Sequence, residues 1–475
     1  MSLLGLPTEL LDQIFGYLDW NQDEDLYPTK QSIINGSVTC KQLRKVLVPL
    51  VFQDVTLKIC WAGGVLVSPA LLKLRREKPE LARHIKCVYI RTDFTFIAQY
   101  NDHPDWDPFI TPDDAEDWLR YSEHRTTPNQ LETFRQRANE IAQDIERSQS
   151  SSISENPHNF NRIAEQAIRY IVVPHPSGRY HAQHEKLIAL ALVMLCIPPS
   201  INSLVIRILA DGDVTDTKPR FALCVAATAV EMLRDWLTDI TFVASGTGES
   251  IGRGTPTSNG VYGTKYFTPD AVGRTAVQHL TLASAEKMSL LSRSSRWLQQ
   301  GLDCWISASD TIVALNLKNI ATNLPDLAAF IAKFTQLKHL RISNVVLSPI
   351  QGHGHGQAGP EVQARIWLRL SIDVRRALPN TDIRLGRLCM PVYSSITGIS
   401  RHEDLPPDAI TWLQKAVLGE KLLDADREER LLEDFDSFLP LWAAEADLER
   451  GPKAVTEWDK MRGKLSDQAM SRRWR

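Results

Sequence analysis

The sequence predicts an α/β protein in which a short N-terminal helical module precedes a long body of alternating helices and strands. Two observations support this: amphipathic helical segments fill the first 57 residues, and the body repeats a helix followed by a strand of the type Leu-x-x-Leu-x-Leu. The chain has 475 residues, of which 43% are hydrophobic and 23% are charged. This composition excludes a wholly disordered chain, a collagen and a coiled coil. The net charge of −3 argues against a protein that coats nucleic acid.

The N-terminal module begins with an amphipathic helix that opens at Leu6 and Pro7. Proline is favoured in a first turn because its missing N–H would have no partner there. At about 100° per residue, five apolar side chains share an arc of about 140°: Leu10, Leu11, Ile14, Phe15 and Leu18. A second helix is expected near residues 30–37, a third after Thr39, and a strand at 51–57. Three short helices bury too little apolar surface to be stable alone. The apolar face of the first helix should therefore pack against a partner or the body.

Two segments of the module, LPTELLDQIFGYL and SVTCKQLRKVLVPLVFQDVTL, resemble the F-box. The matching positions are Leu6, Pro7, Leu10, Leu11, Ile14, Phe15 and Leu18 in the first half and Val38, Cys40, Leu43 and Leu47 in the second. About six additional residues around 21–28 lengthen the first loop relative to the family, which a surface loop tolerates at small entropic cost. The aromatic residue that often follows Cys-Lys in the family is absent.

The resemblance implies a non-catalytic substrate receptor of a Skp–cullin–F-box ubiquitin ligase. The matching residues would dock on a Skp-family adaptor by helix-in-groove recognition, and the adaptor would join the chain to a cullin. The resemblance implies no catalytic, cofactor-binding or metal-binding residue. Two alternatives remain at this point: a scaffold that binds the adaptor outside any ligase, and an N-terminal helical subdomain that packs only on its own body.

Five segments of the body share one strand pattern, in which aliphatic residues recur at the first, fourth and sixth positions. They are Ile85-x-x-Val88-x-Ile90, Ile201-x-x-Leu204-x-Ile206, Val277-x-x-Leu280-x-Leu282, Ile312-x-x-Leu315-x-Leu317 and Leu337-x-x-Leu340-x-Ile342. Asn344 follows the last of these, as an asparagine does in leucine-rich repeats. Helices are expected at 187–197 and 324–334, each before a strand.

The body resembles the irregular leucine-rich-repeat-like α/β solenoids that often follow an F-box in fungal proteins. Its spacing is irregular, since 35 residues separate Leu280 from Leu315 and 25 separate Leu315 from Leu340. The alternative is a non-repeat α/β domain with unrelated parallel strands. We therefore expect an F-box at 1–57, a repeat-like domain at 58–400 and a mainly helical segment at 401–475.

A largely helical insertion is expected at about 95–185. It opens with seven carboxylates between Asp102 and Asp117, accompanied by Trp106 and Trp118, and continues into a helix at 129–147. The acidic stretch is either a docking surface for a basic partner or a solvated face.

Several features bear on the cellular compartment and on metal sites. Seven cysteines without a CxxC pair predict reduced, buried thiols in the cytoplasm or nucleus. The longest apolar run, 187–197, is too short to span a membrane, and the N-terminus is a poor signal peptide. Two histidine groups lack the spacing of a defined metal motif and predict surface loops: His175, His181 and His184, and His353 with His355.

One further alternative is a serine hydrolase. Gly248-Glu249-Ser250-Ile251-Gly252 matches the nucleophile-elbow pattern, and Asp373 or Asp382 with His402 would complete a triad. The elbow requires a helix directly after the serine, whereas RGTPTSNGVYG predicts a loop. We therefore expect Ser250 to lie in a loop and the chain to perform no catalysis.

Overall fold

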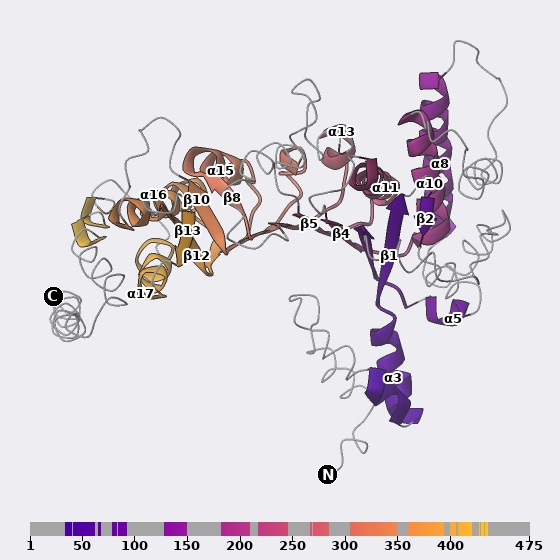
Figure 1. Ribbon diagram of the computed structural model, residues 1–475, viewed down its shortest axis with the longest axis horizontal. Helices are drawn as coiled ribbons and strands as arrows, with labels where there is room; N and C mark the ends of the chain where they lie inside the picture. The colour runs from indigo at the N-terminus through magenta and orange to yellow at the C-terminus, as the bar shows by residue number, and fades with distance from the viewer. Residues whose placement is uncertain are drawn as a thin grey trace. The chain divides into compact units, whose positions relative to one another are not determined.

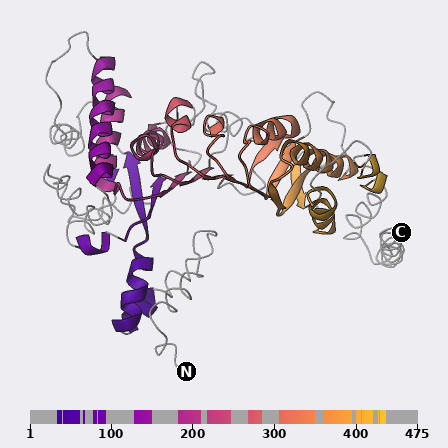
Figure 2. The ribbon, with the colours of Figure 1, turned by 180° about the vertical axis from the view of Figure 1, so that it is seen from behind.

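The computed structural model describes residues 34–61, 65–67, 78–92, 128–149, 182–209, 217–245, 267–284, 305–348, 360–393, 400–419 and 427–435, with short gaps inside several of these ranges. The chain divides into two compact units, shown in Figures 1 and 2. Unit 1 comprises Met1–Ala244 with Lys265–Val277, and unit 2 comprises Ser245–Thr264 with Gln278–Arg475.

The protein is an α/β protein, as the sequence predicts. Among the described residues, eight strands of one parallel set alternate with helices along the chain, four of them in each unit. Unit 2 has further parallel strands in a second sheet. This arrangement fits a leucine-rich-repeat-like solenoid and other parallel α/β folds alike.

Unit 1 has the strand order β5-β4-β3-β1-β2. Its strands are β1 (Asp54–Trp61), β2 (Val65–Val67), β3 (Cys87–Thr92), β4 (Ser203–Leu209) and β5 (Asp239–Ser245). β3 lies between β1 and β4 and is parallel to both, whereas the short β2 runs antiparallel to β1 at the edge. The strand that closes the predicted N-terminal module is therefore part of the parallel sheet.

Helices of unit 1 pack on its sheet and on one another. The helices are α3 (Lys41–Val51), α5 (Pro79–Ala82), α8 (Pro128–Gln149), α10 (Ala182–Cys196), α11 (Thr217–Leu233) and α13 (Pro269–Gly273). α11 packs on β1, β3 and β4, α10 packs on α11, and α8 packs on both of these helices. Every residue from Phe221 to Val230 is buried, so α11 has no polar face along this stretch.

Successive strands of unit 1 enter the sheet through the same hydrogen-bond arrangement. The carbonyl oxygen of Gln53 accepts from the N–H groups of Lys86 at 2.8 Å and Cys87 at 3.1 Å. The carbonyl oxygen of Lys86 accepts in turn from Asn202 at 3.2 Å and Ser203 at 3.3 Å. Unit 2 repeats this arrangement at Gln278 and Val313. The register of the parallel strands is thus set at the residues that precede each of them.

Unit 2 has the parallel strand order β11-β9-β7-β6, and a second sheet of order β13-β12-β10-β8 lies in the same unit. The first sheet consists of β6 (His279–Ser284), β7 (Ala314–Lys318), β9 (His339–Ser343) and β11 (Asp382–Leu385). The second consists of β8 (Ala321–Asn323), β10 (Val345–Ser348), β12 (Leu388–Tyr393) and β13 (Ser400–Asp404). The helices are α15 (Leu324–Ile331), α16 (Pro360–Ala377), α17 (Pro407–Trp412) and the π-helix η4 (Leu413–Val417).

Two asparagines make the corners at which the chain passes from one sheet of unit 2 to the other. Asn319 lies between β7 and β8 with φ 56°, and Asn344 lies between β9 and β10 with φ 57°. Asparagine tolerates this left-handed backbone better than most residues. The side-chain amide of Asn344 donates to Oδ1 of Asn319, so equivalent corners are joined to one another. The third corner has Gly386, where an added Cβ would lie 2.9 Å from Cβ of Ser343.

The five predicted strand segments are confirmed as parts of β3, β4, β6, β7 and β9, and their patterned aliphatic residues are at most 5% exposed. The helices predicted at 129–147, 187–197 and 324–334 are confirmed as α8, α10 and α15. The strand predicted at 51–57 begins three residues later, because α3 continues to Val51. The second sheet and α11 were not predicted. Among the described residues, no helix is long and apolar enough to span a membrane.

A buried arginine joins the C-terminal elements of unit 2. Arg375 on α16 is 4% exposed. Its Nη1 donates to the carbonyl oxygens of Leu378 at 3.3 Å, Pro379 at 2.9 Å and Thr381 at 3.0 Å, and its Nη2 donates to that of Leu418. Desolvation lowers the pKa of Arg375. The guanidinium thus holds the end of α16, the approach to β11 and the end of η4 together.

The outer edge of β11 is covered by one side chain. Gln414 on η4 accepts a hydrogen bond from the N–H of Leu385 at 2.8 Å and donates one to the carbonyl oxygen of Ile383. These are main-chain groups that a further strand would otherwise pair. An uncovered strand edge is a template for pairing with another chain, so Gln414 caps this end of the sheet.

Replacing Gln414 with alanine is expected to lower the free energy of unfolding by about 1–2 kcal/mol, because two hydrogen bonds to a partly buried strand are lost. Urea denaturation of the full chain measures the change. Lys415→Ala is the matched control, since Lys415 is the exposed neighbour on η4 and should change stability by no more than about 0.5 kcal/mol. Equal stability of the two variants would contradict the capping role.

Candidate functional site

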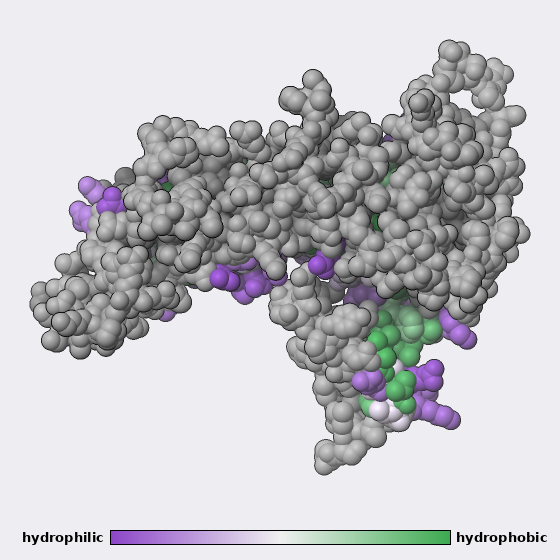
Figure 3. All heavy atoms as spheres, in the orientation of Figure 1, coloured by the Kyte–Doolittle hydropathy of each residue, from purple (hydrophilic) through white to green (hydrophobic). Residues whose placement is uncertain are grey.

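The parallel sheet of unit 2 has one open face. Side chains alternate along β7, β9 and β11 between buried aliphatic residues and more exposed polar ones, and Leu340 and Ile342 are each 1% exposed between exposed neighbours. Sheets made only of parallel strands usually have both faces covered. Figure 3 shows hydrophilic side chains gathered on the side of unit 2 away from α15.

A hollow of about 310 Å³ lies on this open face, and we call it the strand-face hollow. It is lined by His279, Leu280, Thr281, Ala314, Leu315, Asn316, His339, Leu340, Arg341, Asp382 and Arg384. The strand register arranges its outward-facing residues in two rows. One row runs His279, Ala314, His339 and Asp382, and the other runs Thr281, Asn316, Arg341 and Arg384.

Asp382 is the one carboxylate among the described residues that line the hollow. Its Oδ2 lies 3.1 Å from Nε of Arg384 and 3.6 Å from Nδ1 of His339. These side chains are 45–75% exposed, so each pair contributes little to stability. No described carboxylate pairs with Arg341, the register partner of Arg384 on the neighbouring strand. The hollow therefore carries an excess of positive charge.

Asn316 adds an unsatisfied acceptor to the same row. Its Oδ1 is buried and has no hydrogen-bond partner within the described part of the chain. Such groups are uncommon in folded proteins and cost about 1–3 kcal/mol when left unpaired. A ligand donor or an ordered water would satisfy this oxygen.

The predicted adaptor-binding residues are described only in part. Leu6, Pro7, Leu10, Leu11, Ile14, Phe15, Leu18 and Cys40 lie outside the described residues. Val38 is 75% exposed in the helical segment 34–39, and Leu43 on α3 is half-buried. Figure 3 shows apolar side chains gathered over α3. Single exposed apolar residues are common, so only a continuous apolar surface over α3 would fit a partner-binding surface.

Leu47 lies inside the module, where it is 1% exposed. A Cβ added at Gly36 would lie 2.9 Å from its Cδ1, so the glycine allows the helical segment 34–39 to pack closely on α3. Leu47 can therefore serve docking only by fixing how these two helices pack.

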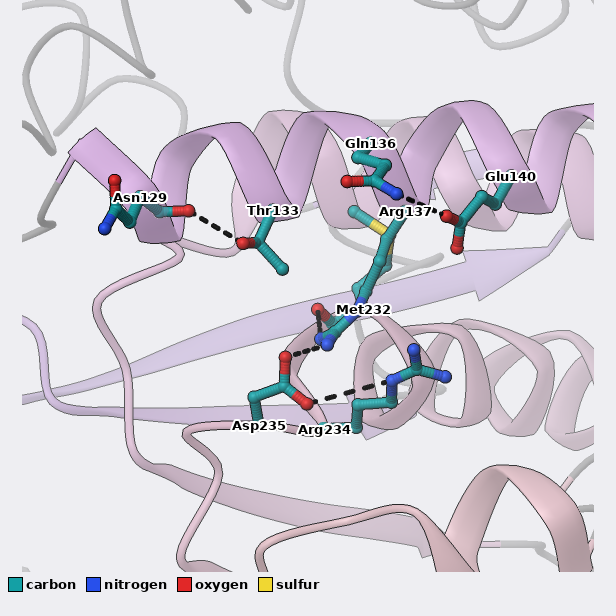
Figure 4. A network of polar contacts seen from close by, with 8 residues as sticks. All are labelled: Asn129, Thr133, Gln136, Arg137, Glu140, Met232, Arg234 and Asp235. Carbon is teal, nitrogen blue, oxygen red and sulfur yellow. Dashed lines mark hydrogen bonds and ion pairs between the residues drawn. The ribbon is translucent and has the colours of Figure 1, made fainter.

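The insertion helix α8 is anchored to the body of unit 1 by Arg137 (Figure 4). The Arg137 side chain is 7% exposed and forms an ion pair with Asp235, while its Nη1 donates to the carbonyl oxygen of Met232 at 3.0 Å. The guanidinium also lies 5.3 Å from the ring centroid of Trp236. Desolvation, with a smaller effect from the nearby charge of Arg234, lowers the pKa of Arg137 to about 10. The guanidinium of Arg137 therefore stays charged at neutral pH, and Asp235 compensates this buried charge.

Three cysteines have described side chains. Cys87, Cys196 and Cys224 are free and buried, as predicted for these three. Burial, with a smaller effect from the charges of Asp54 and Asp239, raises the pKa of Cys87 to about 12. The thiol is therefore protonated at neutral pH and is a poor nucleophile.

The two histidine groups do not enter the described geometry. His175, His181, His353 and His355 lie outside the described residues. The loop predicted at His184 is wrong, because this residue falls within α10, at a position whose side chain is not described. Within the described ranges, no three His, Cys, Asp or Glu side chains are grouped so as to hold a metal ion.

The candidate serine triad is not assembled within the described ranges. Ser250 lies outside them, and His402 is in β13 with its side chain not described. Asp373 on α16 lies 3.3 Å from Nε of Arg369 and 3.8 Å from Nη1 of Arg376. Asp382 belongs to the strand-face hollow.

Sequence reasoning missed the hollow, although a signal for it was present. The lining residues occupy the variable positions of the strand pattern, such as His339 and Arg341 on either side of Leu340. Those positions become a site only once strands distant in sequence are placed in register. Comparison of the chain with protein families, with curated proteins and with solved structures finds no match.

Proposed function

We propose that this protein is the substrate-recognition subunit of a Skp–cullin–F-box ubiquitin ligase. The N-terminal module would bind a Skp-family adaptor, and the body would bind a protein substrate. The observation that carries the proposal is the two-part F-box resemblance between Leu6 and Leu57. The exposed Val38 and the apolar surface over α3 support it.

The path of the chain supports the linkage that such a receptor needs. β1 follows α3 after two residues and is hydrogen-bonded in parallel to β3. A module tied directly to the sheet of unit 1 would carry that unit with it when it binds the adaptor. The contribution to ubiquitin transfer is then proximity, which raises the effective concentration of substrate lysines.

A leucine-rich-repeat-like body, which we propose here, would have a binding role. Its parallel strands share one aliphatic pattern, and unit 2 leaves one sheet face open and polar. Such a face presents variable side chains on a rigid backbone, which suits recognition of a partner. No chemistry by the chain itself is proposed.

Leu11→Asp combined with Phe15→Asp is expected to reduce co-purification of a Skp-family adaptor at least about tenfold, because buried aliphatic and aromatic anchors carry most of the energy in such interfaces. The full-length chain and the adaptor are co-expressed, and the recovered adaptor is quantified. Gln13→Asp is the control, since Gln13 falls outside the apolar arc of the helix. Unchanged adaptor recovery with the double variant would show that the docking assignment is wrong.

The same purification separates a ligase subunit from an adaptor-binding scaffold. Recovery of a cullin together with the adaptor is expected for a ligase subunit. Adaptor without cullin would favour the scaffold.

A further inference from the structure

The strand-face hollow has more cationic side chains than carboxylates, as an anion-binding site would. Its lining contains two arginines and two histidines but one carboxylate, Asp382, among the described residues. Asp382 is already in contact with Arg384 and His339. Arg341 is left without a described carboxylate partner.

The two arginines are also placed where they repel one another. Arg341 and Arg384 are register partners on the parallel strands β9 and β11. Neighbouring strands are about 4.8 Å apart, and like charges directly opposite are destabilising. An anionic group bound between them would turn this repulsion into two charge-assisted hydrogen bonds.

Asn316 extends this row on the other side of Arg341. Its buried Oδ1 is an acceptor without a partner. Because this oxygen is shielded from solvent, a main-chain N–H of an extended peptide would reach it only after the Asn316 side chain rotates toward the hollow. An anionic side chain at the arginines and a main-chain donor at Asn316 would be contributed by one short peptide segment.

We propose that the strand-face hollow binds an acidic peptide segment, with a carboxylate or phosphate held between Arg341 and Arg384. This inference rests on the proposed function, because it names the class of substrate segment that the receptor would recognise. The volume of about 310 Å³ suits a few side chains rather than a broad protein surface. No phenylalanine, tyrosine or tryptophan lines the hollow among the described residues, so bases could stack there only on the histidines and arginines, and nucleic acid is the weaker fit.

The test uses the purified full-length chain and three immobilised peptide libraries that are degenerate except for the central residue. That residue is glutamate, phosphoserine or glutamine. We expect the chain to retain the glutamate or phosphoserine library about tenfold more than the glutamine library. Stronger retention of the phosphoserine library would identify phosphate as the preferred anion, and equal or stronger retention of the glutamate library would identify carboxylate.

Arg341→Ala combined with Arg384→Ala should abolish this selection. Arg365→Ala combined with Arg376→Ala is the matched control, because it removes the same charge from exposed positions on α16 outside the hollow. Arg341→Glu combined with Arg384→Glu should transfer the preference to a library with a central lysine. Thermal unfolding of each variant verifies that it is folded.

Three results would overturn the inference: no preference for an anionic central residue, a preference that survives the change of both arginines, or displacement of the peptides by single-stranded RNA. Adaptor co-purification is measured on the same samples. Loss of peptide selection with adaptor binding intact would reject this inference alone. Peptide selection without adaptor binding would reject the proposed function and leave the peptide site standing.

Discussion

Replacing Arg375 with alanine is expected to lower the free energy of unfolding of unit 2 by about 4 kcal/mol. The substitution removes hydrogen bonds to four carbonyl oxygens at once and leaves a cavity in the core. A buried acceptor that loses its partner costs about 1–3 kcal/mol. The four bonds join the connection between α16 and β11 to the end of η4, which lies 43 residues further along the chain. Hydrogen exchange of α16, β11 and η4 measures the change locally.

The adjacent residue provides the control for this experiment. Arg376 is about half-exposed and lies 3.8 Å from Asp373 in a surface ion pair, so Arg376→Ala should cost no more than about 0.5 kcal/mol. Arg375→Lys should fall between the two, because one ammonium cannot reach four acceptors in the geometry of the guanidinium fork. Similar effects of Arg375→Ala and Arg376→Ala would contradict the joining role of Arg375.

Replacing Asp235 with alanine is expected to destabilise the packing of α8 by about 3 kcal/mol, and by more than the removal of Arg137 itself. Asp235→Ala leaves a buried guanidinium with one carbonyl and the face of Trp236 as partners. Arg137→Met fills the same space with an apolar chain and leaves Asp235, which is 50% exposed, to water. That variant should therefore cost about 1–2 kcal/mol.

Hydrogen exchange of α8 in both variants measures this order of effects. Glu132→Ala is the control on the same helix, because Glu132 is 76% exposed and pairs with Arg135 at 4.0 Å. It should change protection by no more than about 0.5 kcal/mol. If Arg137→Met opens α8 at least as much as Asp235→Ala does, the buried charge is not what makes Asp235 necessary.

Strands and helices with one buried face could be predicted, because the spacing of their apolar residues is visible within a short stretch of sequence. Aliphatic residues at alternating positions around Leu340 and Ile342 can be buried together only in an extended strand, and the structure places both at 1% exposure. The helix α15 was predicted in the same way from apolar residues at helical spacing. Helices buried on all sides show no polar period. α10 was still predicted from its uninterrupted apolar run, whereas Thr228 interrupts the run of α11, which was missed.

The sequence by itself determined the α/β class, five of the parallel strands of the body and the F-box resemblance. The tertiary structure alone decided which variable positions meet. His279 and Arg384 are more than 100 residues apart in the sequence, yet they line one hollow because four parallel strands lie in register. The roles of Gln414 and Arg375 could not be predicted from the sequence either. A side chain that caps a strand edge or holds separate segments together leaves no periodic pattern in the sequence, because its role depends on contacts with residues distant in sequence. The physical reason is that burial imposes a repeating pattern on each element, whereas register is fixed by hydrogen bonds between elements.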